Sequence, residues 1–301
     1  MHKLTKPATI TVIIPTCYGG HSLISTVKSL RATRGGKDVR VIVTADRTPL
    51  TPNIKLVLKN LGVELYWNDV EGSQFKKIKQ LVAKARSAIV ISTQDDITFD
   101  RRILLSVVNA FQKNPQLTMV GARVLPLFPK TRTEAALAVM VRLIDRVSQT
   151  WENGQNYLAA SGRFLAFRNS HIQKFRLPDT VVNGDMFLYL ENTRLGGKFA
   201  QLQDGIVYIR TPQKLKDQIG PSSRFQYSKN ELKRYFDFDI SPNYSLPKSV
   251  FLFAIFKELI RSPLNTIFYL AIFGYTRLKK QPPKVVANPV WAVDPSTKLI
   301  T

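Results

Sequence analysis

The 301-residue sequence contains a single cysteine, Cys17, and only three histidines. One cysteine excludes an internal disulfide and a cysteine-based zinc cluster, and the scattered histidines argue against a histidine-rich metal site. Carboxylates are also scarce, because 21 Asp and Glu stand against 44 Lys and Arg, a formal net charge of +23. This excess indicates a polyanionic partner, either an anionic membrane surface or nucleic acid. The cysteine usage fits a reducing, cytoplasmic setting.

Several common motifs are missing as well. No Gly-x-Gly-x-x-Gly follows the first apolar run, and no Gly-Lys-Ser/Thr loop occurs, so the usual dinucleotide and P-loop fingerprints are excluded. The basic residues are spread along the chain without a zinc-finger or RNA-binding aromatic motif, and we therefore expect no nucleic-acid partner. The apolar run at 8–14 is too short and too β-branched for a signal peptide, and it predicts a strand.

The first third of the chain alternates β-branched runs with helical patterns. Strands are predicted at 10–14, 39–44, 63–67 and 88–92, and helices at 23–30, 53–61 and 75–85. Strands separated by helices indicate βαβ units. The predicted fold class is therefore α/β, a Rossmann-like and mostly parallel sheet flanked by helices, which we assign to residues 1–240.

Polar residues follow three of these strands: Pro15, Thr16 and Tyr18 the first, Asp46 the second, and Asp95 with Asp96 the fourth. Ligands of open α/β sheets bind at this carboxyl edge. An aromatic face with hydroxyl and carboxylate groups suits a nucleobase and a ribose. Two adjacent carboxylates repel each other unless a cation lies between them, and a hard divalent ion is the usual solution. For an isolated Asp-Asp pair the alternative is a solvated acidic turn.

Together these strand ends resemble family 2 glycosyltransferases of the GT-A fold, over residues 9–210. The resemblance implies a nucleotide-sugar donor, with UDP-sugar expected, whose nucleoside is contacted by Pro15, Thr16, Tyr18 and Asp46. It also implies that Asp95, of an Asp-x-Asp-like element, binds Mn²⁺ or Mg²⁺ and through it the donor diphosphate, with Asp96 in support. The sequence departs from the family because Thr93 or Gln94 stands where the first Asp would be.

Two basic residues are candidates for the donor phosphates. Lys79 belongs to the lysine-rich helical segment before the fourth strand, where the family often carries basic residues; a solvated helix face is the alternative. Arg224 lies in a segment that loosely resembles the family's Gln-x-x-Arg-Trp element, and a guanidinium forks well onto phosphate.

The candidate catalytic base is Asp185, at the start of a predicted helix. It follows a strand at 162–168 that resembles the family's Gly-x-x-x-Ala-Phe-Arg segment, and Gly184 stands where the family carries a Glu. The resemblance implies that Asp185 deprotonates an acceptor hydroxyl as it attacks the anomeric carbon. A helix cap is the alternative role for this residue.

The composition changes after residues 241–247, a predicted linker. Apolar, aromatic-rich runs at 250–256 and 264–275 are shorter than the ~20 residues that cross a bilayer. We expect residues 248–284 to form two amphipathic helices in the membrane interface, with basic flanks toward lipid headgroups; a dimer interface is the alternative. The tail, 285–301, resembles the endings of some membrane-associated bacterial glycosyltransferases, in which it can return to the donor site, or it is an ordinary terminus.

The sequence thus predicts an inverting, metal-dependent glycosyltransferase of the hexosyltransferase type. We expect it to act peripherally at the cytoplasmic face of the inner membrane, on a lipid-linked or glycan acceptor of cell-envelope synthesis; homo-oligomerisation is left open. One rival is a nucleotidyltransferase, which would carry a Gly-rich basic loop where this chain has residues 15–20. The other is a catalytically inactive, basic membrane-binding protein of the same fold.

Overall fold

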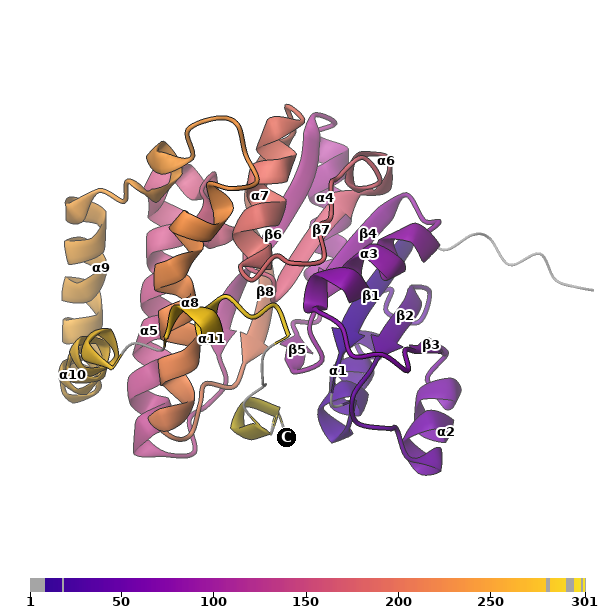
Figure 1. Ribbon diagram of the computed structural model, residues 1–301, viewed down its shortest axis with the longest axis horizontal. Helices are drawn as coiled ribbons and strands as arrows, with labels where there is room; N and C mark the ends of the chain where they lie inside the picture. The colour runs from indigo at the N-terminus through magenta and orange to yellow at the C-terminus, as the bar shows by residue number, and fades with distance from the viewer. Residues whose placement is uncertain (1–8, 18, 280–281, 291–294, 299, 301) are drawn as a thin grey trace, which may run out of the picture.

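The computed structural model describes residues 9–17, 19–279, 282–290, 295–298 and 300. Its centre is one eight-stranded sheet in the order β3-β2-β1-β4-β7-β6-β8-β5, flanked by helices (Figure 1). The strands are β1 (Ile10–Thr16), β2 (Arg40–Ala45), β3 (Val63–Trp67), β4 (Ile89–Thr93), β5 (Ile97–Phe99), β6 (Leu117–Pro126), β7 (Phe164–Arg168) and β8 (Lys198–Ile209).

The helices in the described ranges are α1 (His21–Arg31), α2 (Pro52–Asn60), α3 (Gln74–Lys84), α4 (Ile103–Lys113), α5 (Arg132–Thr150), α6 (Asn169–Ile172), α7 (Gly184–Arg194), α8 (Lys216–Leu232), α9 (Lys248–Arg261), α10 (Pro263–Leu278) and α11 (Pro283–Val286). Side chains define several of their starts. The Ser73 hydroxyl accepts the Lys76 N–H at 3.0 Å ahead of α3, and Thr131 forms a capping box with Glu134 at the start of α5.

The prediction of a parallel sheet is confirmed for one half. β3, β2, β1 and β4 pair in parallel, whereas β7 runs antiparallel to both β4 and β6. On the far side, β6 pairs in parallel with β8 and the short β5 closes the sheet antiparallel to β8. β5, β8 and α8 were not predicted from the sequence, because the three residues of β5 are too few for a pattern and β8 and α8 mix polar with apolar residues.

Successive residues of β1 enter different cores. Val12 and Ile14 pack on one face of the sheet in a cluster with residues of α1 and α4, while Ile13 packs on the other face with residues of α3 and α7. A parallel strand covered on both faces must be apolar throughout, which explains the unbroken run in this segment.

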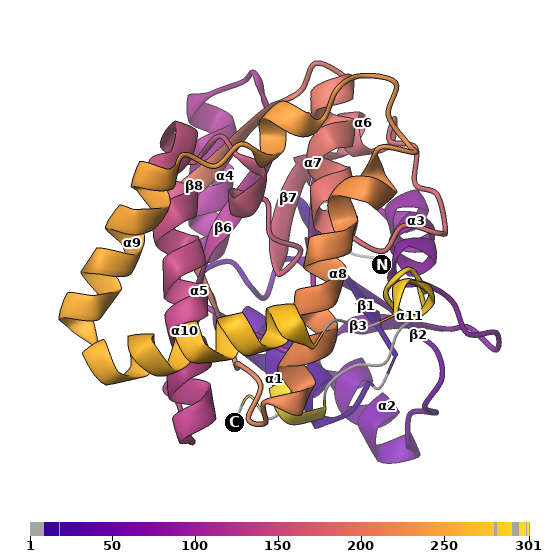
Figure 2. The ribbon, with the colours of Figure 1, turned by 60° about the vertical axis from the view of Figure 1, so that its left-hand side comes forward.

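The C-terminal helices α9 and α10 form a third cluster with α5, outside the sheet (Figures 1 and 2). The buried Glu258 carboxylate of α9 accepts from Arg142 Nε of α5 at 2.8 Å and lies 3.5 Å from Arg146 Nη2. The two helices predicted from the apolar runs are confirmed and are longer than those runs. Within the described ranges, none of the helices has the length and hydropathy needed to span a bilayer.

The acidic tip is not followed directly by a helix. Strand β5 comes between Asp96 and α4, and α4 begins at Ile103. The Asp100 carboxylate accepts the Arg102 N–H at 2.8 Å, so it forms a local turn before the helix instead of the cap.

Candidate active site

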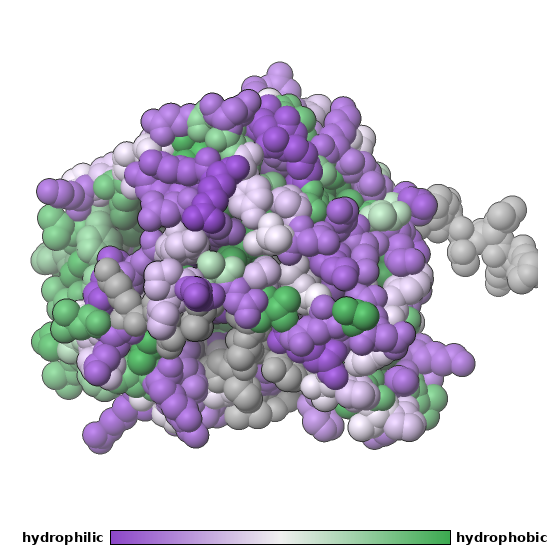
Figure 3. Space-filling model, in the orientation of Figure 1, coloured by the Kyte–Doolittle hydropathy of each residue, from purple (hydrophilic) through white to green (hydrophobic). Residues whose placement is uncertain are grey.

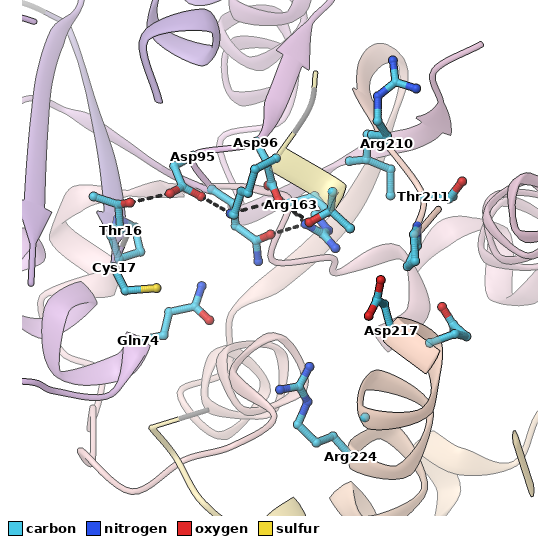
Figure 4. Close-up of a pocket in the computed structure, with 18 of the residues that line it drawn as sticks. Thr16, Cys17, Gln74, Asp95, Asp96, Arg163, Arg210, Thr211, Asp217 and Arg224 are labelled. Atoms are coloured by element: carbon cyan, nitrogen blue, oxygen red, sulfur yellow. Dashed lines mark hydrogen bonds and ion pairs between the residues drawn. The ribbon is translucent and has the colours of Figure 1, made fainter. Parts of the chain in front are cut away.

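A cleft of about 490 Å³ lies at the carboxyl ends of β1 and β4, between the sheet and α8 (Figure 4). Ligand pockets of this size are typical of small-molecule sites. Cationic side chains outnumber carboxylates in its lining: Arg47, Lys77, Arg163, Arg210, Lys216, Arg224 and Lys298 against Asp95, Asp96 and Asp217. The cleft is therefore suited to a ligand with several negative charges.

Asp95 and Asp96 lie together in this cleft, as predicted from the end of β4, and both are about 4% exposed. The Thr16 hydroxyl donates to Asp95 Oδ2, and the ammonium of Lys298 donates to Asp95 Oδ1 and, at 3.0 Å, to Asp96 Oδ2. Burial acts to raise the pKa of Asp96, but the charges of Lys298 and Arg163 outweigh it and hold that pKa below 3.8. Both carboxylates thus share one positive charge.

Thr93 and Gln94, which precede the acidic pair, hold the segment that leads into β7. The Thr93 hydroxyl donates to the Arg163 carbonyl at 2.7 Å, and Gln94 Oε1 accepts from Arg163 Nη1. The same guanidinium nitrogen lies 3.3 Å from Asp96 Oδ1 (Figure 4). In place of a further carboxylate, the chain therefore has a guanidinium held beside the acidic pair.

The predicted nucleoside residues divide into two layers. Pro15 and Thr16 line the cleft. Asp46 is fully buried behind it and accepts from Lys77 Nζ at 2.7 Å and from the Gly72 N–H at 3.0 Å. Its second oxygen, Oδ1, has no hydrogen-bond partner within the described part of the chain. Tyr18 lies outside the described residues.

The prediction that Lys79 contacts the donor phosphates is wrong, because this residue does not line the cleft. Its side chain is 61% exposed and its ammonium lies 3.8 Å from Asp179. The buried lysine of α3 is Lys77, which lines the cleft. Positions two apart on a helix point to nearly opposite faces, so only one of these two lysines can face the sheet.

Arg224 does line the cleft, on the α8 side opposite Asp95 (Figure 4). Burial, together with the charge of Arg163, lowers the pKa of Arg224 to about 10. The guanidinium is still charged at neutral pH. Two cations brought close together in a partly buried cleft favour an anion between them.

Asp185 lies beside the cleft rather than in its lining. The Asn183 side chain caps α7, and the Glu231 carboxylate accepts the Val182 and Asn183 N–H groups at 2.6 and 3.2 Å, so the loop before Asp185 is fixed to α8. Burial raises the pKa of Asp185 above 3.8, against a backbone hydrogen bond from Gly162 and the charge of Arg163, which lower it. A raised pKa is what a general base needs.

Two glycines near Asp185 have no room for a side chain. A Cβ on Gly162 would lie well under 3.0 Å from Asp185 Oδ1, and a Cβ on Gly184 would lie well under 3.0 Å from the ring of Phe75. With Phe75 in its present place, position 184 therefore cannot carry a larger residue such as Glu.

Three of the residues in the cleft were not predicted from the sequence: Lys77, Arg163 and Lys298. The apolar face of α3 identifies Lys77 as inward-pointing, because it lies one turn before the buried Leu81 and next to the buried Ile78. Arg163 had no such signal, and the approach of Lys298 to residues about 200 positions earlier requires the three-dimensional fold.

No family model matches the chain, and no curated protein sequence matches it. Solved structures do match. A mannosyltransferase from Pyrobaculum calidifontis, PcManGT, in complex with GDP-Man and Mn²⁺, has a TM-score of 0.56 at 15% identity, covering 91% of this chain and 76% of that one. Glucosyl-3-phosphoglycerate synthase from Mycobacterium tuberculosis, in complex with Mn²⁺, UDP and phosphoglyceric acid, has a TM-score of 0.53 at 14% identity, covering 78% and 81%.

The same synthase with Mg²⁺ and UDP gives a TM-score of 0.53 at 15% identity, covering 76% of this chain and 79% of that one. At such identities the likeness concerns the fold and not the substrates. The mixed sheet and the helices on its faces place this chain in the GT-A fold that these glycosyltransferases share.

Proposed function

We propose that this protein is a metal-dependent, inverting glycosyltransferase of the hexosyltransferase type that uses a nucleotide-sugar, with a UDP-sugar as the expected donor. The observation that carries the proposal is the pair of buried carboxylates, Asp95 and Asp96, at the carboxyl end of β4 in a cleft rich in Lys and Arg. The fold supports it, because the solved structures that match include transferases with GDP-Man or UDP bound beside Mn²⁺ or Mg²⁺.

The donor set fits a hard divalent ion. Within the described part of the chain no three His, Cys, Asp or Glu side chains converge on one point, but two carboxylates do. Mg²⁺ is commonly held by one or two carboxylates together with substrate phosphates. Asp95 and Asp96 would hold the ion, which stabilises the charge of the departing nucleoside diphosphate when bound. Arg224 would neutralise the same charge from the α8 side.

Asp185 would accept the proton of the acceptor hydroxyl. Its raised pKa suits that role, and Arg163 is close enough to influence the pKa of both Asp185 and Asp96. The Arg163 guanidinium lies 3.3 Å from Asp96 Oδ1, and its charge acts on both the metal carboxylates and the base. Pro15 and Lys77 would hold the nucleoside, and Asp46 would position Lys77 from behind the cleft.

Turnover tests the assignment of the base. Asp185→Asn should abolish transfer while thermal protection by nucleotide and Mn²⁺ is retained, and Asp179→Asn, an exposed carboxylate paired at 3.8 Å with Lys79, is the matched control. A panel of UDP- and GDP-sugars with Mn²⁺ or Mg²⁺ identifies the donor. Unchanged turnover in Asp185→Asn would remove it as the base. Protection without turnover in the wild type would favour the inactive binding protein.

The outer face of α9 and α10 indicates from which side the acceptor reaches the cleft. Large apolar side chains are exposed there, including Leu252, Phe256 and Ile260 of α9 and Leu264 and Leu278 of α10, the last two more than 80% exposed. Figure 3 shows them as a hydrophobic region at the left edge of the molecule. Soluble monomers rarely expose an apolar patch of this kind, and amphipathic helices with basic flanks bind anionic membrane interfaces.

We therefore assign this face to an anionic membrane surface, at the cytoplasmic side of the inner membrane, from which a lipid-linked or glycan acceptor would enter the cleft. The test is flotation of the full-length protein with vesicles of neutral or anionic lipid. Phe256→Glu combined with Leu264→Glu should lose binding to anionic vesicles, and Leu105→Glu, an exposed leucine of α4, should not. Equal flotation of all three proteins would contradict the assignment, and dimerisation lost in the double variant would favour a subunit interface.

A further inference from the structure

The C-terminal tail places a lysine ammonium between the two carboxylates of the candidate metal site. Lys298 ends a short 3₁₀ turn (Pro295–Lys298), and its Nζ pairs with Asp95 Oδ1 and lies 3.0 Å from Asp96 Oδ2. The Thr297 hydroxyl lies 3.5 Å from the same Asp96 oxygen, and the Gln213 N–H donates to Ser296 Oγ at 3.2 Å. The turn is thereby attached to the cleft wall as well as to the acidic pair.

The Lys298 ammonium reduces the repulsion between the adjacent carboxylates of Asp95 and Asp96. Asp95 and Asp96 are adjacent and buried, so without a nearby cation their charges would repel each other at a high desolvation cost. The Lys298 side chain is itself only 18% exposed, so the pairing is shielded from solvent. Burial acts to lower the pKa of Lys298, but the two carboxylates outweigh it and raise that pKa.

The Lys298 ammonium and a divalent ion cannot bind Asp95 Oδ1 and Asp96 Oδ2 at the same time. Mg²⁺ commonly lies about 2.1 Å from its ligand oxygens, so an ion held by Asp95 and Asp96 would need the carboxylate oxygens that now accept from Lys298. The two cations would repel each other strongly at such separations. Binding of one therefore requires release of the other.

We propose that Lys298 is an internal cation that competes with the divalent metal for Asp95 and Asp96, and that it leaves when metal and donor bind. The inference rests on the proposed metal-dependent function. It gives the tail a specific role at the donor site: it keeps the acidic pair neutralised in the resting protein and withdraws to open the metal site. The turn is four residues long and is held at the cleft by side-chain hydrogen bonds and ion pairs, so its release does not require the sheet or α8 to move.

Metal affinity measured without nucleotide tests the competition directly. Free Mn²⁺ is followed by its electron paramagnetic resonance signal during titration of the full-length protein. Lys298→Met should bind Mn²⁺ at least tenfold more tightly than the wild type, because the metal no longer displaces an ammonium. Lys284→Met, an exposed lysine of α11, is the matched control and should bind as the wild type does.

Asp95→Asn distinguishes a failure of the competition by Lys298 from the absence of the metal site. Equal Mn²⁺ affinity in the wild type and in Lys298→Met, lost in Asp95→Asn, would refute the competition while leaving the metal site in place. No Mn²⁺ binding in any variant, even with UDP or GDP present, would refute the metal site and with it the proposed function.

Amine labelling of the wild type gives a second measurement that does not depend on the folding of a variant. A short pulse of an acetylating reagent, read by mass spectrometry, should modify Lys298 slowly in the free protein and faster once Mn²⁺ and UDP are added. Lys284 serves as the internal reference, with a constant rate. A Lys298 labelling rate that does not change with Mn²⁺ and UDP would overturn the proposal.

Discussion

The ion pair between Lys77 and Asp46 should be essential for the stability of the cleft wall. The two side chains are 4% and 0% exposed and their charged atoms lie 2.7 Å apart. Lys77→Met would leave the Asp46 carboxylate buried with one remaining donor, the Gly72 N–H. Removing one partner of a buried pair costs about 3–5 kcal/mol in the free energy of unfolding, because the other charge is left uncompensated.

This loss of unfolding free energy can be converted into a change in melting temperature. The entropy of unfolding, about 2.1 cal/mol/K per residue, gives about 0.6 kcal/mol/K for a chain of 301 residues. Lys77→Met should therefore lower Tm by about 5–8 °C. The double variant Asp46→Asn/Lys77→Met removes both charges, so it should recover most of this loss.

Urea denaturation and calorimetry of the four proteins of this cycle measure the coupling between the two residues. Lys79→Met is the matched control on the same helix, since Lys79 is exposed and should contribute less than about 1 kcal/mol through its contact with Asp179. Lys77→Met should also weaken protection by nucleotide, and Lys79→Met should not. If the two lysine variants lost equal stability, the assignment of Lys77 to a buried pair would be refuted.

Three further outcomes follow from the same contacts. Gly162→Ala would push the Asp185 carboxylate aside, so kcat should fall about 100-fold at nearly unchanged Tm; normal turnover would contradict the close approach. Because burial raises the pKa of Asp185 and the base must be ionised, kcat/KM should fall as pH is lowered through a value above 3.8, and a limb at or below 3.8 would contradict the assignment. Glu258→Gln should destabilise the protein by about 3 kcal/mol and speed hydrogen exchange in α9, since Arg142 and Arg146 lose their shared carboxylate; a urea midpoint equal to that of the wild type would refute this.

The parallel half of the fold was predictable because its inner strands are buried on both faces, whereas β3 at the edge is only partly buried. β1 and β4 are buried from end to end, and the turn residues that follow them had to meet at one edge. The antiparallel half gave a weaker signal, because β8 alternates between buried and exposed positions and carries Gln and Asp within it. Strand order beyond β4 depends on contacts between β6, β7 and β8 that no local pattern specifies.

In the candidate site, too, some residues could be predicted from the sequence and others only from the fold. Asp95, Asp96 and Arg224 were found because each follows a strand or resembles a motif, and all three line the cleft. Lys79 was chosen over Lys77 because the family resemblance specifies a basic segment and not a helix face; packing against the sheet buries one lysine and exposes the other. The family resemblance suggested that the tail can return to the donor site, but not that Lys298 would reach the acidic pair.

The charge balance at Asp95 and Asp96 couples metal binding to donor binding. With Lys298 in place, the ammonium and the Arg163 guanidinium together balance the two carboxylates; with a divalent ion in place of the ammonium, the group would carry one net positive charge, which attracts a diphosphate. Donor binding must then favour the metal-bound form, and by thermodynamic linkage the metal must raise donor affinity by the same factor. Lys298→Met also removes the ammonium but leaves one carboxylate charge uncompensated, so its donor affinity without metal should be lower than that of the wild type. The coupling factor between metal and donor should therefore be larger in the variant, and a smaller factor would show that Lys298 does not provide the charge that the metal replaces.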